Sequence, residues 1–311
     1  LWVGSVEGGA PTIVLEGIED MGSTAWMPDG RSIVFSRSED GPEDPDDFKR
    51  YRGLVDRWGG SRNVSSLHQV SVPDGIVRRL TAGDLSTSLE SIAPDGAHLL
   101  FTRSLRDDAT WPFNRDELVE LDLATLETEV LATEDWGLGA DYDRTGTRIA
   151  ITAPASAFAG AGRAVDDDVQ VNLYDSQLFL MDRSTGNVRA ISRDFDPEIG
   201  SVAWVGERDE ILVSATDRSY AGLFRYDVRR QSWEELPTEA EVVGGMTISR
   251  DGRTVAYTAT GTNMPRVVRA GKLRNWNPET VRAFDLESIE LLEFGDVKDF
   301  DVTIGEDTIV G

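Results

Sequence analysis

Chemistry that needs a histidine base has two candidates in this chain, His68 and His98. Such a base serves a nucleophile, and the sequence has no cysteine for that role. It also lacks the Gly-x-Ser-x-Gly turn that exposes a catalytic serine, since the nearest candidate, Gly59–Asn63, has no closing glycine. Both histidines stand beside apolar residues in β-rich runs. We therefore expect them to be ordinary strand residues rather than catalytic groups.

Clustered oxygen donors are the residues that would hold a hard cation such as Ca²⁺. The sequence has two acidic groups, but their spacing matches no metal-binding loop. In a chain this acidic we expect both groups to be solvated loops, and we predict no metal site and no cofactor. The two groups are Asp166, Asp167, Asp168, Asn172 and Asp175, and Glu43, Asp44, Asp46 and Asp47.

The charge balance excludes two classes of partner. The 311 residues include 56 Asp and Glu but 31 Lys and Arg, which gives a formal net charge of −25. Nucleic acids and anionic membrane surfaces both require clustered basic residues, so we expect neither as a partner. The hydrophobic share of 40% is enough to form a buried core. The absence of cysteine leaves the cellular compartment open.

The two ends of the sequence look like cut points in a longer polypeptide. The chain opens at Leu1 rather than at a methionine, with no basic segment and apolar stretch of a signal peptide. It stops within Asp307–Gly311, which has the pattern of a strand in mid-course. No window holds the about 18 apolar residues of a membrane span. Oligomeric state stays open, and an oligomer is possible.

A first sequence unit recurs along the chain: a small or aromatic residue, a tight turn and a short β-rich run. Proline presets the first corner of the turn, aspartate bonds back to the backbone, and glycine takes the left-handed position. Flanking β-branched and aromatic residues make each copy a predicted hairpin. Trp26 and Trp204 occupy equivalent positions, and we expect both to pack between sheets. The copies are 25–35, 91–101, the weaker 141–150 and 247–257, and the degenerate 202–213.

A second hairpin unit alternates with the first, at 67–75, 118–123, 178–186 and 223–227, and the opening 1–9 is a copy without its first half. Two alternating hairpins make a four-stranded sheet, the blade of a β-propeller. We predict an all-β propeller with five whole blades and a half blade, and an incomplete ring. A β-sandwich is the alternative, but it does not explain the alternation. The predicted long insertions fall within blades, at 39–64, 104–115 and 154–175.

These repeats resemble the propeller of the prolyl oligopeptidase family of serine peptidases. The run Tyr174–Asp182 and the following Thr185–Pro197 are similar to a stretch of its dipeptidyl-peptidase-like members. Asp56–Arg62 resembles their blade insertion but departs from its Arg-x-Trp-Asp-x-Trp pattern. The tail, Phe294–Asp301 with Asp307–Gly311, looks like the strand that leads into the α/β-hydrolase domain. The Pro-Asp-Gly hairpins are also found in TolB-like propellers.

The resemblance implies a division of labour. Residues 1–288 would be a propeller that gates and positions a peptide substrate, and 289–311 a linker and first strand leading to a hydrolase domain. The catalytic triad would lie in that domain after residue 311, so the enzymatic status of this chain is left open. Its partners would be the peptide and its own hydrolase domain. The alternative is a TolB-like propeller that binds a protein.

The resemblance also points to substrate contacts. Dipeptidyl peptidases similar to this family hold the amino terminus of a peptide with a pair of acidic side chains. Asp116 and Glu117 are an adjacent acidic pair beside a predicted insertion, although the start of a surface hairpin would look the same. Arg57 and Trp58 are candidates for a carbonyl clamp and an apolar pocket wall.

Overall fold

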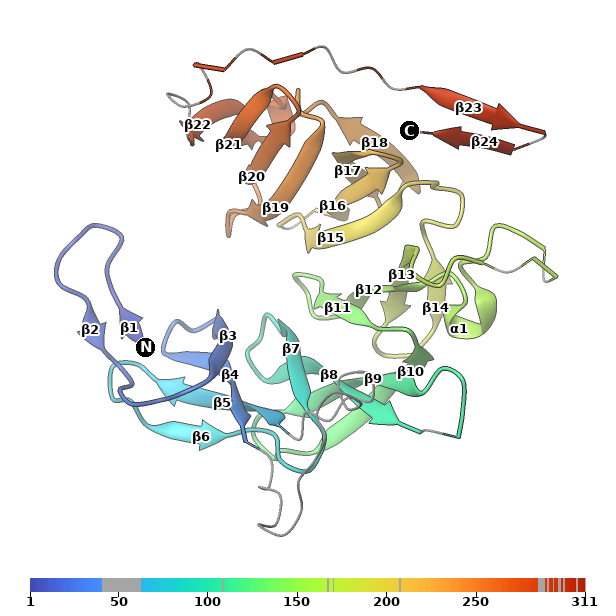
Figure 1. Cartoon of the computed structure of the whole chain (residues 1–311). Coiled ribbons are helices and arrows are strands. Elements are labelled where there is room, and N and C mark those ends of the chain that lie inside the picture. Colours follow the sequence, from blue (N-terminus) through green and yellow to red (C-terminus); the bar gives the residue numbers. More distant parts are fainter. Residues whose placement is uncertain are drawn as a thin grey trace, which may run out of the picture. The chain divides into compact units, whose positions relative to one another are not determined.

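In the structure of the chain, a computed structural model, the regular secondary structure of the described residues is almost entirely β-strand (Figure 1). It divides into two compact units, Leu1–Tyr142 and Asp143–Gly311, which are described separately. None of the helices in the described part of the chain is long and apolar enough to cross a bilayer. The described residues are 1–40, 63–107, 109–166, 168–169, 171–206, 208–284, 289, 291–292, 294–295, 298, 300–305 and 307–310.

The first unit contains a two-stranded hairpin and two four-stranded antiparallel sheets. The hairpin joins β1 (Trp2–Val3) to β2 (Thr12–Ile13), and the last strand of the unit is β11 (Gly139–Tyr142). The sheets have the orders β3-β4-β5-β6 and β7-β8-β9-β10. Their strands are β3 (Met21–Trp26), β4 (Ser32–Glu39), β5 (Val64–Ser71), β6 (Val77–Arg79), β7 (Thr87–Ile92), β8 (His98–Arg106), β9 (Asn114–Asp122) and β10 (Thr128–Asp135).

The second unit continues the same pattern. Strands β12, β13 and β14 pair in that order, and the meanders β15–β18 and β19–β22 follow, joined by one parallel bridge from Ala221 to Val242. A separate hairpin of β23 (Asp301–Ile304) and β24 (Asp307–Val310) follows. The remaining elements are β12 (Arg148–Pro154), α1 (Ala157–Gly160), β13 (Ser176–Asp182), β14 (Val188–Ala190), β15 (Glu198–Trp204), β16 (Glu210–Asp217), β17 (Tyr220–Asp227), β18 (Ser232–Leu236), β19 (Val242–Ile248), β20 (Thr254–Gly261), β21 (Met264–Lys272), a 3-10 turn (Leu273–Asn275) and β22 (Glu279–Ala283).

The four-stranded sheets confirm the alternating hairpins that the sequence predicts. Within the described ranges there are three four-stranded sheets and two four-stranded meanders that one bridge joins into an eight-stranded sheet, and each meander is counted as a sheet. The β1–β2 hairpin stands where a half blade was expected. The long connections are also confirmed. They run between the second and third strands of a sheet, from Glu39 to Val64, Arg106 to Asn114 and Pro154 to Ser176.

The recurring turn forms as its residues dictate. Gly30 and Gly96 have φ of 68° and 70°, in the left-handed region where a side chain would be strained. The carboxylate of Asp29 accepts a hydrogen bond from the Arg31 amide at 2.8 Å. In the next copy of the turn, Asp95 accepts the corresponding hydrogen bond from the Ala97 amide at 2.8 Å. Each turn therefore closes a first-to-second-strand hairpin and sets its register.

A second regularity lies in the strand pairing. In four of the five sheets, the first strand has an irregularity in register. In the first, fourth and fifth sheets it lies beside a Ser or Thr of the second strand, whereas in the second sheet Glu90 lies between the pairs Leu89–Phe101 and Ser91–Leu100. In the fourth sheet, the hydroxyl of Ser214 accepts a hydrogen bond from the Ser201 amide at 2.8 Å. In the second sheet, Thr102 donates to the carboxylate of Glu90 at 2.8 Å. The hydroxyls beside an irregularity are those of Ser36, Ser214 and Thr258.

Apolar side chains fill the space between neighbouring sheets. In the first unit, Val34 and Leu67 of one sheet join Phe101 and Val119 of the next in one buried cluster. Two further clusters in the second unit follow the same plan. Polar side chains that interrupt this packing are therefore notable, because each needs a partner for its charge or hydrogen bonds.

Candidate functional site

The adjacent acids Asp116 and Glu117 lie in the first half of β9, and consecutive residues of a strand face opposite sides of the sheet. Glu117 is opposite Arg103 of β8 and accepts a hydrogen bond from its Nε at 2.6 Å. Asp116 accepts a hydrogen bond from the hydroxyl of Ser104 on the other side. The two carboxylates therefore do not converge on one ligand, as a paired clamp would require.

Asp116 shares its side of the sheet with a different carboxylate, Glu90. Ser104 and Thr102 are alternate residues of β8, so they face the same way, and Thr102 donates to Glu90. Burial raises the pKa of Glu90, and the negative charge of Asp116 acts in the same direction. The backbone amide of Ala140 also donates to Glu90, at 3.4 Å. A protonated amine placed between these carboxylates would relieve their repulsion.

We refer to Glu90, Asp116 and Glu120 as the acidic face. Glu120 is on the same side of β9 as Asp116, and the Tyr142 hydroxyl of β11 donates to it at 2.5 Å. Ser91 of β7 donates to Asp141 at 2.7 Å beside it. The face thus lies along the side of the second sheet that β11 approaches. Its carboxylates are suited to a charge-assisted contact with a cation such as a peptide amino terminus.

Sequence reasoning identified Asp116 but missed Glu90. The sequence offers one signal for it, the residue type near the irregularity of the first strand. In the first, fourth and fifth sheets this part of the first strand contains Gly22, Gly200 and Gly244. In the second sheet a charged residue, Glu90, stands at the irregularity instead. The other two predicted site residues, Arg57 and Trp58, lie outside the described residues.

The two histidines lie where the sequence places them, in strands. His68 is 7% exposed in β5, and its ring stacks on Phe35 at a centroid distance of 5.4 Å. His98 begins β8 and lies within 3.9 Å of Asp95 and 3.8 Å of Asp122. In these contacts of His68 and His98, no serine or threonine hydroxyl is placed for a histidine base to activate.

The two predicted acidic loops are described only in part. In the part of the chain that the structure describes, no three His, Cys, Asp or Glu side chains are grouped so that they could hold a metal ion. The backbone carbonyl of Asp166 accepts a hydrogen bond from Arg163, and Asn172 caps its own turn at Tyr174. Asp167 and the group 43–47 lie outside the described residues.

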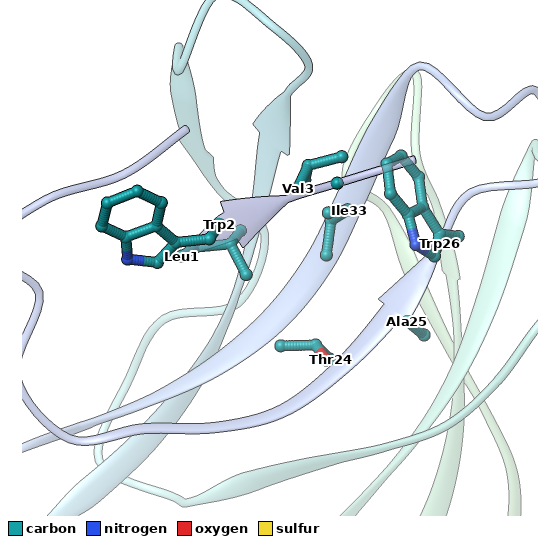
Figure 2. Close-up of a pocket in the computed structure, with 8 residues that line it drawn as sticks. Leu1, Trp2, Val3, Thr24, Ala25, Trp26 and Ile33 are labelled. Atoms are coloured by element: carbon teal, nitrogen blue, oxygen red, sulfur yellow. The ribbon is translucent and has the colours of Figure 1, made fainter. Parts of the chain in front are cut away.

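A hollow of about 290 Å³ opens between the β1–β2 hairpin and the first sheet (Figure 2). Its lining includes Trp2, Val3, Trp26 and Ile33, and the two indole rings stand at its opposite ends in Figure 2. Trp26 is 49% exposed, whereas Trp204 is 3% exposed in a core cluster. Packing between sheets is confirmed for Trp204 and wrong for Trp26. Trp26 lies beside the two-stranded β1–β2 hairpin, which buries less of its ring than a complete four-stranded sheet would.

No protein-family model matches this sequence, and no curated protein matches it either. Solved structures do match its fold. Acylaminoacyl peptidase in complex with Z-Gly-Gly-Phe-chloromethyl ketone has 13% identity and a TM-score of 0.72, over 99% of this chain and 45% of that chain. Pyrococcus horikoshii acylaminoacyl peptidase has 12% identity and a TM-score of 0.71, over 99% of this chain and 46% of that chain.

TolB from Acinetobacter baumannii matches at 17% identity and a TM-score of 0.58, over 88% of this chain and 57% of that chain. The chain has the β-propeller architecture of these proteins. It resembles the propeller regions of the acylaminoacyl peptidases and of TolB, at low sequence identity. It spans less than half of each peptidase chain and just over half of this TolB chain.

Proposed function

We propose that this chain is the non-catalytic propeller of a serine peptidase of the prolyl oligopeptidase family. Residues 1–288 would gate the access of a peptide substrate and position it, and 289–311 would lead into a hydrolase domain. The extent of the structural match carries this proposal. The two acylaminoacyl peptidase matches extend over 99% of the chain, and so over nearly all of the tail, whereas the TolB match stops at 88%.

The exposed tail supports the same proposal. The β23–β24 hairpin forms a two-stranded sheet of its own, and such hairpins are marginally stable in isolation. Apolar side chains are unusually exposed here: Leu291 is 86% exposed, Phe300 63% and Ile304 62%. A hydrolase domain packed on this segment would cover them.

The acidic face supplies the substrate contact in this proposal. Asp116, with Glu90 in place of Glu117, would hold the amino terminus of the peptide by charge-assisted hydrogen bonds. Arg57 and Trp58 remain proposed as the carbonyl clamp and the apolar wall. The Arg103–Glu117 ion pair would keep β8 and β9 in register beneath this contact.

The test compares residues 1–311 with a polypeptide extended beyond Gly311. We expect the coding sequence after Gly311 to contain a Gly-x-Ser-x-Gly turn. The extended protein should hydrolyse aminoacyl- or dipeptidyl-arylamides and react with a fluorophosphonate serine probe, and residues 1–311 should do neither. Labelling of a serine within 1–311 would contradict the proposal, as would further repeats or a stop codon in place of the hydrolase turn.

The second candidate is a TolB-like module that binds a protein partner. The TolB match over 88% of the chain and the shared Pro-Asp-Gly hairpins favour it. The two candidates differ in the polypeptide expected on the carboxyl-terminal side of the propeller. A protein that ends near Gly311 and has no arylamidase activity would favour the binding module.

A further inference from the structure

The first two sheets can be compared position by position, because their strands pair in the same way. Phe35-Ser36-Arg37 of β4 corresponds to Phe101-Thr102-Arg103 of β8. Arg103 is opposite Glu117 of β9, and Arg37 is opposite Ser66 of β5. A carboxylate therefore faces the arginine in the second sheet, and a serine faces it in the first.

In the second sheet this position is a satisfied ion pair, in which Arg103 Nε lies 2.6 Å from a carboxylate oxygen of Glu117. In the first sheet two polar atoms at the equivalent position lack a hydrogen-bond partner. Arg37 Nε and Ser66 Oγ are both buried, and neither has a hydrogen-bond partner among the described residues. Ser66 is only 2% exposed. Directly opposite side chains in an antiparallel pair have Cβ atoms about 5 Å apart, so these atoms belong to one small site.

A buried polar atom without a hydrogen bond costs free energy. Because Arg37 Nε and Ser66 Oγ both lack one at the same site, we infer that a partner for them is absent. A carboxylate would satisfy both atoms: it accepts from Arg Nε and from a serine hydroxyl, and it neutralises the guanidinium. Glu117 supplies that group in the second sheet, whereas the serine at position 66 is too short and uncharged.

Neighbouring groups leave Arg37 available. Glu39, two residues along β4, pairs with Arg79 at 3.5 Å. His68 faces the same side and contacts the Ser66 carbonyl at 3.3 Å through Nδ1. Burial lowers the pKa of His68, and the charges of Arg79 and Arg37 lower it further, so this ring adds no second positive charge near neutral pH.

We propose that Arg37 and Ser66 form a binding site for the carboxylate of a peptide ligand, in the place that Glu117 fills in the second sheet. The site lies where β4 and β5 approach the 39–64 connection, at the end of the sheet from which that insertion leaves. The proposal depends on the contacts of the first unit alone and not on the presence of a hydrolase domain.

The test follows the Nε–Hε resonance of Arg37 in residues 1–311 by NMR. The probes are N-acetyl-Ala-Ala with a free carboxylate and the same dipeptide as its amide. We expect the free acid to shift the Arg37 resonance saturably and the amide to leave it unchanged. The Arg103 resonance is the internal control, because its partner is already in place. No saturable shift with the free acid, or equal shifts with both probes, would overturn the proposal.

Variants at position 66 identify the site. Ser66→Glu places the carboxylate of the second sheet into the first, so it should lower the affinity for the free acid about tenfold or more. Ser66→Ala removes only the hydroxyl and should lower the affinity a few fold. If Ser66→Glu does not fold, Arg37→Gln serves instead and should abolish binding. Binding that is unchanged in a folded Ser66→Glu or Arg37→Gln variant would show that the carboxylate binds elsewhere.

Discussion

The guanidinium of Arg148 lies over the indole of Trp204, with its central carbon 5.0 Å from the ring centroid. The same guanidinium donates to Asp143 at 2.9 Å and to Asp209 at 2.5 Å. The guanidinium of Arg148 thus covers one face of the Trp204 ring, and two carboxylates fix the position of that guanidinium. Trp26, at the equivalent end of β3, borders the open hollow instead.

This difference predicts unequal effects of truncating the two tryptophans. Trp204→Ala removes a buried ring and should lower the free energy of unfolding by about 3–5 kcal/mol. Trp26→Ala removes a half-exposed ring and should cost about 1 kcal/mol or less. Urea unfolding followed by circular dichroism measures both. An equal cost for the two variants would mean that the hollow beside Trp26 is closed in solution.

Asp143 should make stability depend on pH. Burial alone would raise its pKa, but hydrogen bonds from Arg148, Thr145 and the backbone outweigh burial, and the pKa lies below its ordinary value. A lowered pKa in the folded state adds stability above the ordinary carboxyl range, and this stability is lost as the pH falls through the folded-state value.

Asp143→Asn should therefore lower the free energy of unfolding by about 3 kcal/mol near neutral pH, since it leaves Arg148 with one carboxylate less. The difference from the unmodified protein should shrink as the pH falls below about 4. Urea midpoints across this range measure the effect, with Asp74→Asn at an exposed turn as control. A difference that is constant with pH would exclude the carboxylate charge as the cause.

Asp175 has the opposite behaviour. Burial raises its pKa, and the negative charges of Glu198 and Asp196 raise it further. The folded state therefore disfavours the ionised form, and stability is lost as the pH rises through the carboxyl range. Asp175→Asn should raise the melting temperature near neutral pH and have little effect below about pH 4. A lower melting temperature near neutral pH would show that the carboxylate has a favourable partner in solution.

The opposite faces of β9 allow stability and binding to be separated. Glu117→Gln weakens the ion pair with Arg103 and should lower the free energy of unfolding by about 1–2 kcal/mol. Asp116→Asn should change stability by about 0.5 kcal/mol or less. In the extended enzyme of the proposed function, Asp116→Asn should raise KM about tenfold for substrates with a free amino terminus. N-acetylated substrates are the control, and an equal effect on both would remove Asp116 from amine recognition.

Local sequence patterns were sufficient to predict the hairpins. The turn Pro28–Gly30 and its copies specify backbone geometry through residues that are adjacent in the chain, and the strand order follows from the alternation of the two units. The position of Asp116 in the second sheet was also predictable, because insertion and strand follow each other in sequence.

Side-chain partnerships across strands were not predictable in the same way. Glu117 looked like the partner of Asp116 because they are neighbours in the chain, but a strand points neighbours in opposite directions. Glu90 is the acidic neighbour of Asp116 only because of an irregularity in β7 that shifts the register. The unmatched pair Arg37 and Ser66 becomes visible only when the registers of two sheets are compared.

The long connections all leave a sheet between its second and third strands, while the turns that set the register lie at the opposite ends of these strands. Lengthening such a connection adds only a slowly growing loop entropy and leaves the turn chemistry untouched. Changes in these connections could therefore alter ligand preference at the rim, the end of each sheet that carries them, without changing the turns that define the fold. The same rim is a rational place to graft foreign peptide segments onto this scaffold.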